Sequence, residues 1–307
     1  MELTPILQKT LEIGGSDVFL IPGSPATAKV KGHMVALTEE RVQPADTRKM
    51  IAEAYSMSLD HTEETLQREG DDDFSFSLQN LARFRCNAYK QRGTLAATFR
   101  LVAFGLPDPR KLNIPQMVTG LTDSCRSGMI LVTGPAGSGK STTLACMVDQ
   151  INEERDGHII TIEDPIEYLH PHKRALVSQR EIPGDACSFA RALRAAMREA
   201  PDVIMLGEMR DYETIQTALT AAETGHLLLS SLHTVGAAKT IDRIIDIFPA
   251  NQQQQVRIQL SMVLQAVISQ RLVPTVDGGQ IPVFEMMTVT PAIQNMIRDG
   301  KTFQIDN

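Results

Sequence analysis

The chain has 307 residues, a formal net charge of −7 and 42% hydrophobic residues. Single hydrophobic cores stop growing at about 250–300 residues, so this length predicts two domains. No apolar stretch approaches the roughly 18 residues that a membrane-spanning helix needs. Because the first 15 residues also have the pattern of an amphipathic helix and not of a signal peptide, we expect a cytoplasmic protein.

Residues 1–102 predict a small α+β domain. After the first helix, short apolar runs broken by proline and glycine turns extend over 18–37, and two polar segments that favour helix follow. From Phe74, apolar and polar residues alternate through three runs that end at Val102. This alternation indicates an antiparallel meander with one buried face.

Residues 103–115 contain three prolines and no hydrophobic period, and we expect them to form a linker. Residues 116–307 then carry short apolar runs separated by helical segments, at 129–132, 158–162, 203–206 and 227–229. Strands that are apolar on both faces are typical of a parallel sheet covered by helices, so this domain should be α/β. A helix that opens at 252–255 should continue to Val267.

The four cysteines lie far apart with no C-x-x-C pair, which argues against a zinc ribbon and against a disulfide-stapled secreted fold. We expect buried thiols that behave as small core hydrophobes. The acidic net charge argues against a nucleic-acid surface that covers the whole molecule, although a local basic patch stays possible.

Residues 134–141, Gly-Pro-Ala-Gly-Ser-Gly-Lys-Ser, match the phosphate-binding pattern G-x-x-x-x-G-K-[ST] between an expected strand and an expected helix. Glycines let backbone N–H groups converge on the β-phosphate of a nucleotide, and the helix N-terminus adds partial positive charge. Lys140 should reach the β- and γ-phosphates, and Ser141 should ligate Mg²⁺. The expected nucleotide-binding residues are Gly134, Pro135, Ala136, Gly137, Ser138, Gly139, Lys140, Ser141 and Thr142.

Hydrolysis also needs a carboxylate that activates the attacking water and an acid near the metal. Glu163 follows the apolar run 158–162, and Glu208 lies one residue beyond the run 203–206, displaced by Gly207. Ligands of open α/β sheets collect at such strand ends. Each acid, read alone, could equally be a surface loop carboxylate.

The segment 224–234 predicts a strand with His226 at one end and His233 at the other. A histidine is more often structural than functional. Beside a phosphate loop, however, His233 could lie near the γ-phosphate and distinguish ATP from ADP.

Four sequence boxes in this order resemble the Walker A, Asp, Walker B and His boxes of the type II/type IV secretion ATPase superfamily. They are GPAGSGKS at 134–141, ITIEDPIE at 160–167, SFARALRAAMREAPDVIMLGEMRD at 188–211 and TGHLLLSSLHT at 224–234. IDRIIDIFP at 241–249, SQRLVP at 269–274 and AIQNMIRDGK at 292–301 are similar to the type IV pilus retraction ATPases, the PilT family.

This resemblance implies a RecA-like P-loop ATPase domain with a smaller PAS-like domain before it. It also implies an ATP- and Mg²⁺-dependent homo-hexamer that acts on the platform protein of a pilus machine, at the cytoplasmic face of the inner membrane. Glu163 would then activate water, Glu208 would act at the metal and water, and His226 and His233 would belong to the His box.

The resemblance further implies roles for arginines. Arg85 and Arg100 match, by spacing, a pair from the N-terminal domain that neutralises charge on the γ-phosphoryl oxygens, although a solvated strand face is the alternative. Arg194 and Arg210 could link neighbouring sites around the ring, whereas an arginine stripe on a helix is usually solvated.

Pilus assembly and type II secretion ATPases are longer and typically carry a four-cysteine zinc module, so its absence favours retraction and twitching motility. Gln294, Met296, Asp299 and Phe19 depart from the retraction pattern, which leaves a PilU-like accessory paralogue or another secretion or assembly ATPase as alternatives. A nucleic-acid translocase would need basic or aromatic pore loops. With no Trp and 5% aromatic residues, we expect no nucleic-acid partner.

Overall fold

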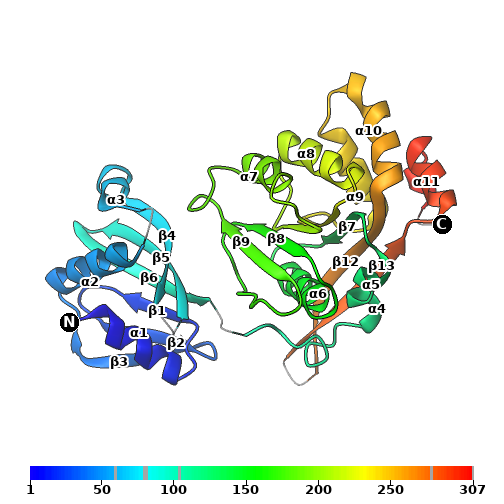
Figure 1. Cartoon of the computed structure of the whole chain (residues 1–307). Coiled ribbons are helices and arrows are strands. Elements are labelled where there is room, and N and C mark those ends of the chain that lie inside the picture. Colours follow the sequence, from blue (N-terminus) through cyan, green and yellow to red (C-terminus); the bar gives the residue numbers. More distant parts are fainter. Residues whose placement is uncertain (59–60, 79–81, 103–104, 277–278, 306–307) are drawn as a thin grey trace. The chain divides into compact units, whose positions relative to one another are not determined.

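The computed structural model describes residues 1–58, 61–78, 82–102, 105–276 and 279–305. The chain divides into two compact units, residues 1–104 and 105–307, and each is described by itself (Figure 1). The expected linker begins with residues 103–104, which lie outside the described residues. Its later part packs on the second unit, because Ile114 is buried there and the Cys146 thiol donates to the Pro107 carbonyl oxygen at 3.4 Å.

The first unit contains an antiparallel sheet with the strand order β3-β2-β1-β6-β5-β4 in its described part. Its strands are β1 (Asp17–Leu20), β2 (Pro25–Val30), β3 (His33–Arg41), β4 (Asp71–Leu78), β5 (Ala82–Gln91) and β6 (Thr94–Val102). Its helices are α1 (Leu3–Glu12), α2 (Pro44–Met57) and α3 (Glu63–Glu69). Phe76 and Phe99 pack with residues of α1 and α2 in one core, while Arg85 and Arg100 alternate onto the opposite face. The predicted meander of β4, β5 and β6 is confirmed.

The second unit contains a sheet with the order β13-β12-β7-β11-β10-β8-β9, parallel except for β13, which pairs antiparallel with β12. Its strands are β7 (Gly128–Thr133), β8 (His158–Glu163), β9 (Leu176–Glu181), β10 (Val203–Leu206), β11 (Leu227–Leu232), β12 (Leu264–Pro274) and β13 (Gln280–Thr288). Its helices are α4 (Gln116–Thr119), α5 (Leu121–Ser124), α6 (Lys140–Glu154), α7 (Phe189–Ala196), α8 (Tyr212–Glu223), α9 (Ala237–Asp246), α10 (Ala250–Val263) and α11 (Pro291–Arg298), followed by the 3₁₀ helix η1 (Thr302–Gln304).

Both faces of this second sheet are buried, as the apolar runs predict. Met129 and Leu131 of β7 pack in a core with α7, α8, α9 and α10, whereas Ile130 and Val132 pack in a second core with α4 and α6. The central strands therefore read as unbroken apolar runs, because alternate residues enter two different cores. The predicted α/β class is confirmed.

The expected helix that continues to Val267 is wrong in its last four residues, because α10 ends at Val263 and β12 begins at Leu264. The apolar run fits both the helical and the strand period, so periodicity alone does not decide it. Pairing with β7 decides it, since Leu264 and Val267 enter one core and Ala266 and Ile268 the other. Strands β9, β12 and β13 were not predicted.

The four cysteines only partly follow the expectation of buried thiols. Cys86 and Cys146 are buried as expected, but Cys125 is only partly buried and Cys187 is exposed, and all four thiols are free. Among the described residues, no helix combines the length and the apolar character needed to cross a bilayer.

Candidate nucleotide-binding site

The phosphate-binding motif forms the loop between β7 and α6, and its glycines are required by the backbone. Gly134, Gly137 and Gly139 have φ angles of 148°, 74° and 86°, which L side chains rarely adopt. A Cβ atom at Gly134 would also lie 2.2 Å from the Gln270 carbonyl oxygen, so a side chain has no room there. The glycines of the phosphate-binding pattern are therefore required by the positive φ angles of the loop and by the close approach of Gln270 to Gly134.

The polar groups of this loop fit a phosphate group. Lys140 is 8% exposed, and its Nζ donates to the carbonyl oxygens of Gly134 and Pro135, each at 3.0 Å. Burial lowers the pKa of Lys140, while the nearby Glu208 and Glu167 act in the opposite direction. The Ser138 hydroxyl is buried and has no hydrogen-bond partner among the described residues. A buried donor without a partner is unusual in a native protein and indicates a ligand oxygen at this place.

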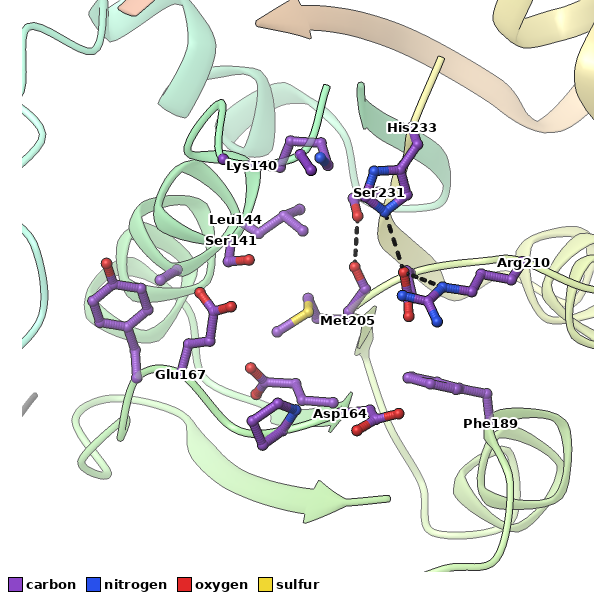
Figure 2. Close-up of a pocket in the computed structure, with 18 of the residues that line it drawn as sticks. Lys140, Ser141, Leu144, Asp164, Glu167, Phe189, Met205, Arg210, Ser231 and His233 are labelled. Carbon is purple, nitrogen blue, oxygen red and sulfur yellow. Dashed lines mark hydrogen bonds and ion pairs between the residues drawn. The ribbon is translucent and has the colours of Figure 1, made fainter. Parts of the chain in front are cut away.

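The loop opens into a pocket of about 230 Å³ at the carboxyl ends of the parallel strands. Figure 2 shows Lys140 and Ser141 of α6 on one side and Arg210 and His233 on the other. Seven polar residues of interest line it: Lys140, Ser141, Glu163, Glu167, Glu208, Arg210 and His233. Thr142 lies beside the pocket, with its hydroxyl 2.9 Å from the Tyr168 hydroxyl.

Glu163 is the last residue of β8 and has a buried side chain, 7% exposed. Thr161 donates to its Oε1 at 2.7 Å and the amide of Gln179 donates at 3.3 Å. Burial raises the pKa of Glu163 to about 7, although these hydrogen bonds favour the charged carboxylate. A carboxyl group with a pKa near neutral pH is suited to taking up and releasing a proton.

Glu208 follows β10 and is held by two neighbours. Its Oε2 lies 2.6 Å from Arg210 Nε and 3.4 Å from His233 Nε2, as the dashed lines in Figure 2 indicate. The Ser231 hydroxyl of β11 donates to the Gly207 carbonyl oxygen at 2.6 Å, which fixes the turn before Glu208. The structure thus brings Glu163, Glu208 and His233 into one pocket with the phosphate loop.

The structure places His226 elsewhere, because the two ends of a strand lie at opposite edges of a sheet. His226 precedes β11, roughly 20 Å along the strand from His233. Its Nδ1 lies 2.9 Å from the Ala221 carbonyl oxygen, and the ring lines a different cavity with His158. His226 thus lies at the amino edge of the sheet and does not line the pocket that holds Glu163, Glu208 and His233.

The predicted arginines lie in three settings. Arg210 lines the pocket, whereas Arg194 is an exposed residue of α7 that forms an ion pair with Glu213 of α8. In the first unit, Arg85 and Arg100 are paired across β5 and β6. This side-by-side pair matches the spacing noted in the sequence.

Two aspartates neutralise the arginine pair of the first unit. Arg100 Nε donates to Asp17 Oδ1 at 2.9 Å, and Arg85 Nε lies 3.7 Å from Asp73 Oδ1. Although burial acts in the opposite direction, the hydrogen bonds from Arg100 and Ser16 hold the pKa of Asp17 below its usual value. The four side chains line a cavity of about 250 Å³ on the open face of the sheet.

Sequence reasoning missed the residues that support the site. Thr161 and Gln179 hold Glu163, Ser231 holds the turn before Glu208, and Gln270 contacts the phosphate loop. Thr161 and Ser231 lie within the Asp box and the His box, but the sequence does not show which groups their hydroxyls contact. For Gln270 the one available signal was its place in the segment SQRLVP.

Comparisons with known proteins agree with this description. Residues 96–280 match the family described as type II/IV secretion system protein. The type IV pilus retraction ATPase PilT of Pseudomonas aeruginosa is 44% identical over 305 residues, which cover 99% of this chain and 88% of the relative. The type IV pilus ATPase PilU of the same organism is 38% identical over 306 residues, with 99% and 79% covered.

Solved structures agree as well. A crystal structure of the pilus retraction motor PilT with bound ADP matches with a TM-score of 0.92 and 48% identity, covering 100% of this chain and 88% of that one. The chain belongs to the PilT family of type IV pilus retraction ATPases, within the type II/IV secretion system proteins.

Proposed function

We propose that this chain hydrolyses ATP with Mg²⁺ in the described pocket and uses the energy to retract type IV pili. The observation that carries the proposal is the buried Glu163, which shares one pocket with Lys140 and the phosphate loop. The identity to PilT, 44% against 38% to PilU, favours the retraction motor over an accessory paralogue. A PilU-like role remains the second candidate function.

The side chains support a division of labour. Lys140 and the loop amides bind the phosphates, and Glu163 accepts a proton from the attacking water. Mg²⁺, when bound, supplies positive charge beside the phosphate oxygens, and Ser141 and Glu208 would hold it, Glu208 through water. Arg210 and His233 both contact the Glu208 carboxylate. His233 would therefore distinguish ATP from ADP through its contact with Glu208.

The roles of the remaining arginines follow the family. Arg85 and Arg100 would exchange their aspartate partners for the γ-phosphoryl oxygens and neutralise the charge that develops there. Release of the products would return them to Asp73 and Asp17. Arg194 is proposed as a contact between neighbouring subunits, since it lies on the exposed surface of α7.

The assembly is proposed on the same basis. Six copies would form a ring in the cytoplasm and associate peripherally with the platform protein at the inner membrane. Turnover around the ring would be transmitted to that protein and extract pilin subunits. No nucleic acid takes part in this proposal.

The test is genetic and uses the intact chain. Deletion of the gene, complemented with wild type or with Lys140→Ala, should give non-twitching, hyperpiliated cells that only the wild-type gene restores. Lys140→Ala protein should neither bind nor hydrolyse ATP, because it lacks the ammonium group that faces the phosphates. Loss of pili would indicate an assembly motor, and stimulation of the purified ATPase by single-stranded DNA would indicate a translocase.

A further inference from the structure

Gln270 of β12 is a buried glutamine beside the phosphate loop, and none of the roles proposed above uses it. Its side chain is 2% exposed, and Thr143 in the first turn of α6 donates to its Oε1 at 2.7 Å. Earlier in β12, Leu264 and Val267 enter one core and Ala266 and Ile268 the other. A buried amide costs free energy unless it is hydrogen-bonded, so its presence at the end of an apolar run calls for a local reason.

The backbone and the side chain of Gln270 touch both ends of the loop. A Cβ atom at Gly134 would lie 2.2 Å from the Gln270 carbonyl oxygen, and one at Gly139 would lie 2.9 Å from Gln270 Nε2. Together with the bond from Thr143, these contacts enclose the loop from its first glycine to the start of α6. The loop therefore has little freedom to take another shape while Gln270 is in place.

The preceding residue, Ser269, contacts the end of β7 and the turn between β11 and α9. Its hydroxyl accepts a hydrogen bond from the Gly236 N–H at 2.9 Å and lies 2.9 Å from the hydroxyl of Thr133, the last residue of β7. Gly236 belongs to the turn after His233, just before α9. The middle of β12 thus contacts the segment before the phosphate loop and the turn after His233.

We propose that Gln270 is a positioning residue that holds the phosphate loop in its nucleotide-binding shape, with Ser269 fixing the turn after His233 to the same strand. This inference rests on the proposed nucleotide site. Gln270 would act through Gly139 and Thr143 and not on the nucleotide itself. Because a loop held in shape before binding loses less conformational entropy, losing Gln270 should weaken binding more than it slows the chemical step.

The first test is Gln270→Met, which keeps the length of the side chain and removes its donor and acceptor. We expect the Kd for a fluorescent ATP analogue and the KM for ATP to rise at least fivefold, with kcat within threefold of wild type. Gln265→Met is the matched control, because Gln265 lies in the same strand beside Gly128, at the opposite edge of the sheet. It should leave both constants unchanged, and thermal unfolding should show that both variants fold.

Thr143 supplies a second, independent test. Thr143→Val should raise KM, Thr143→Ser should restore the wild-type value, and the double variant Thr143→Val/Gln270→Met should be no weaker than Gln270→Met alone. If Gln270→Met does not fold, Gln270→Leu removes the donor and the acceptor without adding a charge and should show the same rise in KM.

The binding experiment gives one result if the proposed function is wrong and a different result if only the role of Gln270 is wrong. A wild-type chain that does not bind the analogue would overturn the proposed function. A folded Gln270→Met variant that binds it as wild type does, or that loses kcat alone, would overturn only the positioning role of Gln270.

Discussion

The carboxylate in the pocket of the second unit and the arginine pair of the first unit are held in opposite ways. Glu163 is 7% exposed, and neutral donors from Thr161 and Gln179 fix it. Arg100 has a side chain that is 71% exposed, and its partner is the charged carboxylate of Asp17. Asp17 itself is only 10% exposed, so Arg100 can leave it only where a competing anion offsets the loss of that contact.

In the proposed function, this difference separates a group that is in place before the nucleotide binds from a group that changes its partner afterwards. A buried group with neutral partners keeps one geometry and a shifted pKa, which suits the activation of water. An exposed cation paired with a replaceable anion is neutralised until another anion competes for it. The comparison therefore predicts that the two groups respond differently to substitution.

The largest effect should follow Glu163→Gln, which keeps the shape of the side chain and removes its basic oxygen. Loss of a general base typically costs 10²–10⁴-fold in rate, so kcat for ATP hydrolysis should fall by about that factor while ATP is still bound. Steady-state ATPase rates and the affinity for a fluorescent ATP analogue measure the two. An unchanged rate would show that Glu163 is not the general base, and the contrast with Arg100 would then say nothing about catalysis.

The same variant should change the pH dependence of stability. The pKa of Glu163 is about 7 in the folded chain against 4.5 in the unfolded chain, so the folded state holds one more proton between these values. Stability from this group is therefore present below pH 4.5 and lost as pH rises through 7, by about 3 kcal/mol.

Glu163→Gln has no titrating group at this position, so its advantage in stability over wild type should grow by about that amount between pH 4.5 and pH 8. Chemical unfolding of both proteins, monitored by circular dichroism at several pH values, measures the difference. A constant difference across this range would contradict the raised pKa and show that Glu163 is well solvated.

The sequence predicted the site better than it predicted what supports it. Residues 134–141 were recognisable because a phosphate loop needs particular residue types at fixed spacing, and Glu163 because it ends an apolar strand. The sequence did not separate His226 from His233, since a resemblance that spans a whole strand does not say which end of the strand lies at the pocket. Gln179 and Gln270 were not found, because they reach the site through strand pairing between segments far apart in sequence.

The smallest effect, and the sharpest test of the comparison, is expected at Arg100. Arg100→Ala should lower kcat at least tenfold, since it removes a positive charge proposed to act on the γ-phosphoryl oxygens. Its free energy of unfolding should also fall, by about 1–3 kcal/mol, because Asp17 is only 10% exposed and loses the cation that compensates its burial.

Asp17→Asn is the matched control, because it removes the same ion pair and leaves the arginine free to act. Its ATPase rate should stay within threefold of wild type, and its free energy of unfolding should fall less than that of Arg100→Ala, because it leaves a neutral amide and an exposed arginine in place of an unpaired buried carboxylate. A loss of stability in both variants with no loss of rate in Arg100→Ala would instead make the pair a structural feature of the sheet surface. A loss of rate in Arg100→Ala alone would show that the exposed cation takes part in ATP hydrolysis and that its ion pair with Asp17 does not.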